Sequence, residues 1–364
     1  MIYLVDTIGN ETGMHLYDQS FCNTLGSKGV DVRVLSNYTS ADGSQRALFP
    51  NFYHGGKLLM VLKFAWSLFV FALFRCSHRK DDDIYVYQSF GLRKIDQFFI
   101  RIIGRKNLYV IVHDIFEITG REGRDPREQQ KLAFYRQHVP AIICHSHDSM
   151  LTLKRLGYPG RLCYYPHFSY QFSKQIDMSH VAPEVRDAVK ADKVNFLFFG
   201  QLRETKGIGI LREAIRLLEQ QGFDHNIIIA GLDKERLLSG QTLPRFVQPI
   251  LRYIDDNELN YLFSRCQYVL LPYTEIYQSG VLEVVIYFRC PALMSDIPYF
   301  RHIADSYPSF GHLFSPNTPQ ALAAQIRECC SAESQSRHYF ADGDIRKYQD
   351  LHDPSHLIAF LQGE

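Results

Sequence analysis

Residues 194–218 read VNFLFFGQLRETKGIGILREAIRLL, an apolar run that ends at a glycine turn and leads into an amphipathic segment. The run predicts a buried strand, and the helical spacing of the apolar residues after the turn predicts a helix. A strand that leads directly into a helix is the repeating unit of a parallel α/β sheet. The turn carries Arg203 and Lys206, and two cations beside a helix N-terminus suit a diphosphate, although their spacing is not that of a Walker A loop. This stretch therefore predicts both an α/β fold and an anion site.

The strand-and-helix unit recurs along the whole chain. Short β-branched runs occur in the first half as MIYLVD, VDVRVLS, DIYVYQS, NLYVIVHD and AIICHS, and in the second half as VNFLFFG, NIIIAGL, PILRYI, YVLLPYT and CPALMSD. Because longer helical stretches separate these runs, we predict two doubly wound domains facing a cleft, with ligands beyond the carboxyl ends of the strands. The predicted bounds are 1–168 for the N-terminal domain, 169–193 for a polar linker, 194–340 for the C-terminal domain and 341–364 for a helical tail.

Length and composition limit the classes of function. A chain of 364 residues with 46% hydrophobic and 22% charged residues is expected to fold into two globular domains. Its net charge of +1 gives no global reason to expect a nucleic-acid partner. The 8 cysteines show no Cys-x-x-Cys spacing, which favours reduced thiols and a cytoplasmic protein. The first residues already read as a strand, so no signal peptide is expected.

A second unusual turn lies in residues 274–291, TEIYQSGVLEVVIYFRCP. Glu275 and Glu283 lie eight positions apart, and the Ser-Gly pair between them predicts the start of a helix. Glu275 is then expected in the loop and Glu283 one turn into the helix. The two carboxylates can approach one ligand from different directions, around a helix N-terminus that favours anions.

Two loops that follow predicted strands in the first half of the chain contain further candidate site residues. Gly9 and Gly13 flank the turn GNETG, where glycine lets backbone amides approach a phosphate or a sugar, although an ordinary strand-to-helix turn accounts for the motif equally well. His113 follows the run NLYVIV, either as a buried histidine or as a side chain that faces the cleft. No second His or Cys accompanies it at ligand spacing, so no metal site is predicted.

The order of these motifs resembles the retaining glycosyltransferases of the GT-B fold, and more narrowly glycosyltransferase family 4, the glycosyl transferases group 1. The resemblance rests on the strand-Gly-x-Leu-x-x-x-Lys-Gly-helix pattern, the Glu-x7-Glu pair and the sequence CPALMSDIPYFRHI, and it is strongest at 194–305. It implies an N-terminal Rossmann-like domain that binds an acceptor and a C-terminal one that binds a nucleotide sugar. It also implies a C-terminal helix that can return to the N-terminal domain.

The resemblance implies roles for individual residues. Glu283 would bind the ribose hydroxyls of the donor, and Glu275 would contact the transferred sugar. His113 would touch the same sugar and steady the charge that develops at its anomeric carbon. The other residues expected to bind the donor are Gly13, Arg203, Lys206, Ser279, Gly280 and Val281.

Two positions depart from the family pattern. The family usually has an arginine where this chain has Gln201, so either Gln201 or Arg203 serves the diphosphate. Residues 276–278, Ile-Tyr-Gln, replace the common Gly-Phe-Gly after the first glutamate. The resemblance therefore predicts the roles of Glu275 and Glu283 better than it predicts the backbone conformation of the loop between them, which is expected to bind the diphosphate.

No Asp-x-Asp motif is evidently placed to offer a metal to the diphosphate. Arg203, Lys206 and the helix N-terminus are therefore expected to neutralise the leaving diphosphate, and we predict no metal and no other cofactor. By resemblance, the reaction is retaining. The acceptor attacks on the face that the diphosphate leaves, and the departing phosphate oxygen helps to deprotonate the acceptor hydroxyl.

Residues 57–80, KLLMVLKFAWSLFVFALFRCSHRK, are nearly continuously apolar and end in a basic cluster. The charge-free part, 64–74, is too short for a bilayer span, which needs about 20 residues. Basic and apolar residues also alternate in a helical rhythm at 91–107. Residues 58–74 are therefore either a core helix or part of a surface that binds anionic membranes. In the second case we expect a lipid-linked glycan acceptor, a role in bacterial surface polysaccharide or glycoconjugate assembly, and a cytoplasmic protein peripheral to the inner face of the plasma membrane.

We therefore predict a retaining, metal-independent glycosyltransferase that uses a nucleotide-diphosphate sugar, with uridine, guanosine and adenosine donors equally compatible. One alternative is an epimerase or hydrolase on the same fold, which would turn over the donor without an acceptor. The other is a non-catalytic subunit that binds a nucleotide sugar. The presence of His113, Lys206, Glu275 and Glu283 argues against the subunit, since an inactive copy is expected to lose some of them.

Overall fold

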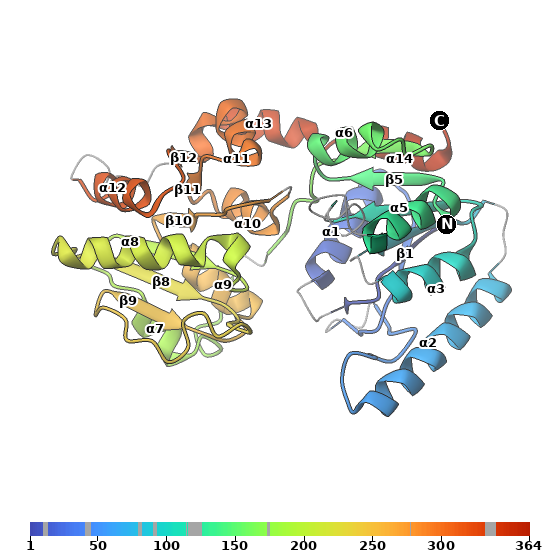
Figure 1. The fold of residues 1–364 in the computed structure, drawn as a ribbon, viewed down its shortest axis with the longest axis horizontal. Coiled ribbons are helices and arrows are strands. Elements are labelled where there is room, and N and C mark those ends of the chain that lie inside the picture. The colour runs from blue at the N-terminus through green and yellow to red at the C-terminus, as the bar shows by residue number, and fades with distance from the viewer. Residues whose placement is uncertain are drawn as a thin grey trace. The chain divides into compact units, whose positions relative to one another are not determined.

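The computed structural model describes residues 1–9, 14–40, 45–78, 82–89, 93–113, 115, 126–172, 175–276, 278–331 and 340–364. These residues form two compact units, one of Met1–Phe168 with His352–Glu364 and the other of Ser169–Leu351. Each unit contains a six-stranded parallel sheet flanked by helices (Figure 1). The predicted α/β fold with two Rossmann-like domains is therefore confirmed.

The sheet of the first unit has the strand order β2-β1-β3-β4-β5-β6. Its strands are β1 (Ile2–Val5), β2 (Val32–Leu35), β3 (Ile84–Ser89), β4 (Leu108–Val112), β5 (Ala141–Cys144) and β6 (Arg161–Tyr164). The helices of this unit are α1 (Met14–Gly26), α2 (Lys57–Ser77), α3 (Arg93–Ile103), α5 (Pro126–His138), α6 (His147–Arg155) and α14 (Ser355–Gln362). β1, β4 and β5 are buried along their whole length, which explains why their sequences are continuous rather than alternating apolar runs.

The sheet of the second unit has the order β12-β11-β10-β7-β8-β9. Its strands are β7 (Asn195–Phe199), β8 (Asn226–Ala230), β9 (Val247–Ile250), β10 (Tyr268–Leu271), β11 (Ala292–Ser295) and β12 (Gly311–Phe314). Its helices are α7 (Pro183–Ala188), η2 (Glu204–Lys206), α8 (Ile208–Gln220), α9 (Asp256–Phe263), α10 (Gly280–Phe288), α11 (Pro298–Ser306), η3 (Pro308–Phe310), α12 (Pro319–Cys329) and α13 (Asp342–Leu351). Because β7 pairs with β10 in parallel, the loops that follow these two strands meet at one edge of the sheet.

Both faces of the second sheet are covered by apolar layers. Phe196 and Phe198 of β7 pack in one layer with Leu211 of α8, whereas Leu197 packs in the other layer with Leu282 of α10. Successive side chains of a strand point to opposite faces, so a strand between two helical layers must be apolar at every position. This explains the uninterrupted run at the start of residues 194–218.

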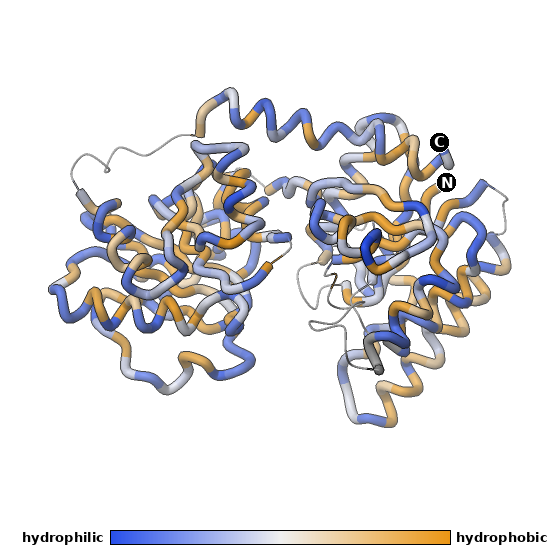
Figure 2. The backbone as a smooth tube through the Cα atoms, turned by 45° about the horizontal axis from the view of Figure 1, so that its top comes forward, coloured by the Kyte–Doolittle hydropathy of each residue, from blue (hydrophilic) through white to orange (hydrophobic). Residues whose placement is uncertain are grey.

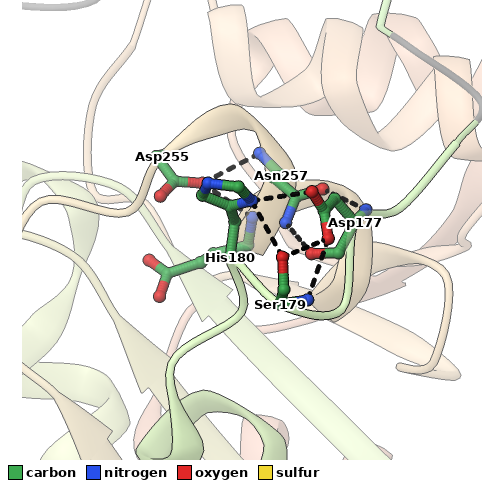
Figure 3. Close-up of polar contacts among 6 residues, drawn as sticks. Asp177, Ser179, His180, Asp255 and Asn257 are labelled. Carbon is green, nitrogen blue, oxygen red and sulfur yellow. Dashed lines mark hydrogen bonds and ion pairs between the residues drawn. The ribbon is translucent and has the colours of Figure 1, made fainter.

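Residues 169–193, predicted as a linker, lie within the second unit. The side chain of Asn257 fastens them to the start of α9, because its Nδ2 donates to the Asp177 carbonyl at 2.7 Å and its Oδ1 accepts from the Asp177 amide at 2.8 Å (Figure 3). Val185 and Ala188 of α7 are buried in the core of the same unit. The polar composition of the stretch does not reveal this packing, since it depends on backbone atoms and a few small side chains.

The predicted tail, 341–364, is divided between the units. α13 belongs to the second unit and α14 to the first. In the first unit the Phe360 ring packs edge-on against Tyr109 with centroids 5.5 Å apart, and the Tyr165 hydroxyl donates to the His352 carbonyl at 2.7 Å. The expected return of a C-terminal helix to the N-terminal domain is therefore confirmed.

α2 is not a core helix, so the structure excludes that alternative for residues 58–74. Its buried residues are Ser67, Phe71 and Phe74, whereas Trp66 is 57% exposed. In Figure 2 the tube of α2 is hydrophobic along most of its length. Within the described part of the chain, α2 is the one helix that is long and apolar enough to cross a membrane, judged by length and composition alone.

Candidate functional site

The turn after β7 places the side chain of Lys206 against the backbone of Gly200. Gly200 has a φ of +107°, and a side-chain carbon there would lie 2.6 Å from Nζ of Lys206. The same carbon would lie 3.5 Å from Cγ2 of Val281 at the start of α10. Lys206 and the first residues of α10 are therefore close neighbours on either side of Gly200, whose backbone conformation favours glycine.

The loops after β7 and β10 are pressed together. Gly207 has a φ of +73°, and a side-chain carbon there would lie 1.6 Å from the carbonyl oxygen of Pro272. The Thr274 amide also donates to the Thr205 carbonyl at 3.0 Å. The second glycine of the turn is thus required by both its backbone conformation and its close approach to β10.

Lys206 is half-buried and lies 5.8 Å from the centroid of the Tyr273 ring. Burial, with a smaller contribution from the charge of Arg203, lowers the pKa of the Lys206 ammonium to about 8. The side chain remains mostly protonated at neutral pH. A bound anion would stabilise the charged form and raise this pKa.

The N-terminus of α10 is formed by the predicted Ser-Gly pair. The Ser279 hydroxyl caps the helix by accepting from the Leu282 amide at 3.1 Å. A side-chain carbon at Gly280 would lie 2.9 Å from the Tyr170 hydroxyl, so this tyrosine lies directly against the first turn. The positive end of the α10 dipole and the Lys206 ammonium thus converge, an arrangement that suits a diphosphate.

Glu283 lies in the first turn of α10 and is buried. Its Oε1 accepts from the Tyr348 hydroxyl of α13 at 2.5 Å, whereas its Oε2 is buried without a well-formed hydrogen bond, although the Ser169 side chain lies close enough to favour the charged form. Burial raises the pKa of Glu283 to about 8. The ligand-free carboxyl group is therefore mostly protonated at neutral pH, and a ligand hydroxyl that reached Oε2 would give this buried oxygen a hydrogen-bond partner.

Two other residues predicted to contact the donor, Arg203 and Glu275, are exposed. Arg203 is exposed, and its Nη2 donates to Oε1 of Gln201 at 3.0 Å, so the two alternative partners of the diphosphate contact each other. Glu275 is exposed in the loop between β10 and α10, as its position before the Ser-Gly pair predicted. Gly13 lies outside the described residues. The structure therefore brings together Lys206, Ser279, Gly280, Val281 and Glu283.

His113 lies at the carboxyl end of the first sheet, in a cluster with two further histidines. His145 and His167 surround the Tyr17 ring together with His113, with centroids 4.8 to 5.6 Å from it. The Tyr17 hydroxyl is 2.7 Å from Nε2 of His145. Burial lowers the pKa of His113 well below its usual value, that of His145 to about 4 and that of His167 to about 3. All three imidazoles are therefore neutral near pH 7.

A buried polar chain fixes the orientation of His113. Its Nε2 lies 3.0 Å from Oε1 of Gln88, whose Nε2 in turn donates to Oδ1 of Asp18 at 2.5 Å. Because the Gln88 oxygen can only accept, Nε2 of His113 carries the proton. Tyr38 donates to Oδ2 of Asp18 at 2.9 Å, and burial, followed by the charge of Asp6, raises the pKa of Asp18 well above its usual value. Sequence reasoning missed Gln88 and Asp18, because their contacts are tertiary.

Among the described residues, no group of three or more His, Cys, Asp or Glu side chains is arranged to hold a metal ion. The eight cysteines are all free thiols, and none forms a disulfide. The positive groups at the described site are Lys206, the N-terminus of α10 and the exposed Arg203.

Part of the chain, which includes this site, matches a known protein family. Residues 184–344 match the family described as glycosyl transferases group 1. This segment contains the β7 turn, both glutamates and the start of α10. No curated protein sequence matches the chain.

Solved structures match along the whole length of the chain. Sucrose-phosphate synthase from Thermosynechococcus elongatus has a TM-score of 0.69 at 14% identity, covering 100% of this chain and 97% of its own. HepE from Anabaena, solved with UDP and glucose, has a TM-score of 0.69 at 15% identity, covering 100% and 99%. WaaG, a glycosyltransferase involved in lipopolysaccharide biosynthesis, has a TM-score of 0.66 at 14% identity, covering 100% of both chains. At these identities the likeness establishes the fold, and the resemblance to the GT-B glycosyltransferases is confirmed.

Proposed function

We propose that this chain, whose residues 184–344 match the glycosyl transferases group 1, is a retaining glycosyltransferase that takes a sugar from a nucleoside-diphosphate donor. The observation that carries the proposal is the convergence of Lys206, Gly200 and the N-terminus of α10 beside the buried Glu283. A cation and a helix N-terminus suit a diphosphate, and a buried carboxyl oxygen without a well-formed hydrogen bond suits a ribose hydroxyl.

The proposed role of these groups is to stabilise charge on the leaving group. As the bond between the anomeric carbon and the phosphate oxygen breaks, negative charge develops on the diphosphate. Lys206 and the amides of α10 are already in place to receive it, so little reorganisation is needed. We propose that this arrangement makes the reaction independent of a metal ion. Glu275 would contact the transferred sugar from the loop before α10.

In a retaining reaction the acceptor approaches the face that the diphosphate leaves. The departing phosphate oxygen can then accept the proton of the acceptor hydroxyl. His113 is neutral, with its proton on Nε2 directed to Gln88, and would contact the donor sugar rather than act as a general base. A neutral imidazole can orient sugar hydroxyls without adding a charge to the site.

For the acceptor, we propose a lipid-linked glycan of the kind used in surface polysaccharide or glycoconjugate assembly, at the cytoplasmic face of the plasma membrane. Support comes from the exposed apolar face of α2 in the first unit. WaaG, with which the chain shares its fold, is described as acting in lipopolysaccharide biosynthesis.

Donor turnover followed by mass spectrometry tests the proposed function. The protein would be incubated with UDP-, GDP- and ADP-sugars in a chelator, with and without a panel of lipid-linked glycans. We expect one donor to yield a glycan heavier by one sugar unit, with the anomeric configuration kept. A free sugar or a new sugar nucleotide formed without an acceptor would instead indicate a hydrolase or an epimerase. Nucleotide binding without any turnover would indicate a non-catalytic subunit.

A further inference from the structure

The exposed side of α2 is an apolar stripe. Five large side chains lie along it at spacings of three or four residues, which places them on one face of the helix. They are Leu58, Leu62, Trp66, Phe69 and Leu73, and each is between 53% and 74% exposed. Soluble proteins rarely leave so continuous an apolar surface uncovered, and such surfaces mark interaction sites. We call these residues the α2 stripe.

The opposite side of α2 holds the helix on the first unit. The Phe71 ring packs on Phe99 with centroids 5.1 Å apart, and the Phe74 ring packs on Tyr3 at 5.3 Å. Both phenylalanines are buried. Because this side is part of the core, α2 lies along the surface of the unit, and its stripe faces outward. This placement favours a partner that meets the helix side-on rather than one that the helix crosses.

Exposed basic residues lie on α3, the helix that packs on the core side of α2, and we call them the basic face of α3. The Phe64 ring of α2 and the Phe98 ring of α3 pack edge-on with centroids 5.9 Å apart, and Phe98 is itself 45% exposed. The exposed basic residues of α3 and the turn after it are Lys94, Arg101, Arg105 and Lys106. The first unit thus exposes an apolar stripe on α2 and basic side chains on the neighbouring helix α3.

Negative charge is missing from this surface. Within residues 57–78 and 93–107 the sole acid is Asp96. It is buried, and it accepts hydrogen bonds from the hydroxyls of Tyr87 at 2.7 Å and Ser89 at 3.0 Å. The exposed side chains of α2 and α3 are therefore apolar, basic or uncharged polar.

We propose that the α2 stripe and the basic face of α3 together bind the surface of an anionic lipid bilayer. The stripe would enter the boundary between headgroups and acyl chains with α2 in the plane of the membrane, and the basic side chains would meet the headgroups. A second copy of the chain is a poorer partner, because a two-fold contact would set the basic face against itself. The proposal deepens the proposed lipid-linked acceptor, which rests on the same face of α2, but vesicle binding can be measured without sugar transfer.

Trp66 gives a direct test, because it is the single tryptophan of the chain and belongs to the stripe. Its emission would be recorded with vesicles of phosphatidylglycerol in phosphatidylcholine and with vesicles of phosphatidylcholine alone. We expect a blue shift and protection from acrylamide quenching with the anionic vesicles. High salt should reverse most of the shift, because it screens the attraction of the headgroups.

Paired variants separate the apolar from the electrostatic contribution. Leu62→Ser with Phe69→Ser, which keeps Trp66, should lower the vesicle partition coefficient at least tenfold, about the effect of losing two buried apolar side chains. The matched control is Leu151→Ser on α6, where the leucine is 51% exposed and lies outside the stripe.

Charge reversal provides the second pair. Lys94→Glu with Lys106→Glu should weaken binding to anionic vesicles at least tenfold, since each basic residue near the surface adds a sizeable share of the attraction. Lys154→Glu with Arg155→Glu, two exposed basic residues of α6, should leave binding unchanged.

Three results would overturn the proposal. Trp66 emission that ignores anionic vesicles at low salt would show that lipid is not the partner. A blue shift that grows with protein concentration in the absence of vesicles would assign the stripe to a second copy of the chain. Protein that resists both salt and alkaline carbonate extraction would point to a helix that spans the bilayer rather than lying on it.

Discussion

The two sheets end in sites of opposite electrostatic character. At the carboxyl end of the second sheet, Lys206 and the N-terminus of α10 present positive charge beside Glu283, whose pKa of about 8 lies near neutrality. At the same end of the first sheet, burial keeps His113 and its two neighbours neutral, and it also favours the protonated form of Asp18. The same architecture thus holds a site suited to an anion and one suited to uncharged hydroxyl groups.

The largest expected effect is on the charged site. Lys206→Ala should lower turnover about 10²- to 10³-fold, the usual effect of removing one group that stabilises charge on a leaving oxygen. Steady-state kinetics with saturating donor would measure it. Lys234→Ala, at an exposed lysine of the same unit, is the matched control and should keep the parent rate. An active Lys206→Ala protein would remove the main support for the diphosphate site.

Glu283→Ala should weaken binding of the nucleoside diphosphate by about 1–3 kcal/mol, because the ribose hydroxyls lose a buried acceptor. Isothermal titration calorimetry would measure the change. Tyr348→Phe serves as the comparison, since it removes the hydrogen bond to Oε1 but leaves the carboxyl group in place. If Glu283→Ala binds as tightly as the parent, Glu283 does not contact the ribose.

The ionisation of Glu283 should also appear in the pH dependence of stability. The unfolded chain loses this proton near pH 4.5, whereas the folded protein keeps it up to about pH 8. Raising the pH between these values therefore favours unfolding, by at most about 1.4 kcal/mol per pH unit. Urea unfolding of the ligand-free protein at several pH values would show it. Glu283→Gln has no such proton to lose, so the difference in unfolding free energy between the two proteins should change with pH by this slope, and a parallel pair of curves would contradict the burial of an ionisable group.

A smaller effect is expected in the neutral site. Gln88→Leu removes the acceptor that holds the proton on Nε2 of His113, at a cost of about 1 kcal/mol, or about fivefold in turnover. Nitrogen NMR of the His113 ring would report the tautomer directly, and the KM for the donor would separate positioning from binding. Gln88→Glu keeps an acceptor for His113 and should restore the tautomer. An unchanged His113 spectrum in Gln88→Leu would show that Gln88 does not set the tautomer.

The smallest effect concerns the exposed edge of the charged site. Arg203→Ala should weaken diphosphate binding by no more than about 1 kcal/mol, since an exposed cation is screened by solvent. Gln201→Ala, at the position where the family usually has arginine, should have a similar or weaker effect. Comparing the two variants at low and high salt would show which one contacts the diphosphate. A loss as large as that of Lys206→Ala would mean that Arg203 moves into the site when donor binds.

Some features of the two sites could be predicted from the sequence alone, and others could not. The turn at Gly200, the cation at Lys206 and the start of α10 were predictable, because each depends on local chain geometry and a short motif. The partners of the buried acids were not. Tyr348 reaches Glu283 from a helix 65 residues away, and Gln88 reaches Asp18 across 70 residues. No periodicity in the sequence records such a contact.

α2 shows a different limit. Its apolar residues occur on every side of the helix, so no hydrophobic face could be assigned from the sequence pattern. The packing of Phe71 and Phe74 in the first unit decides which side is buried. The stripe on the other side, with Trp66 at its centre, follows only from the tertiary structure.

The most direct test of the account is calorimetric titration of nucleoside diphosphate into protein treated with EDTA. The account predicts binding without any metal, which is weakened in Lys206→Ala, persists in Lys234→Ala and weakens as the pH rises above the Lys206 pKa of about 8. It would be contradicted if binding required added Mg²⁺ or Mn²⁺, or if Lys206→Ala bound the diphosphate as tightly as the parent protein.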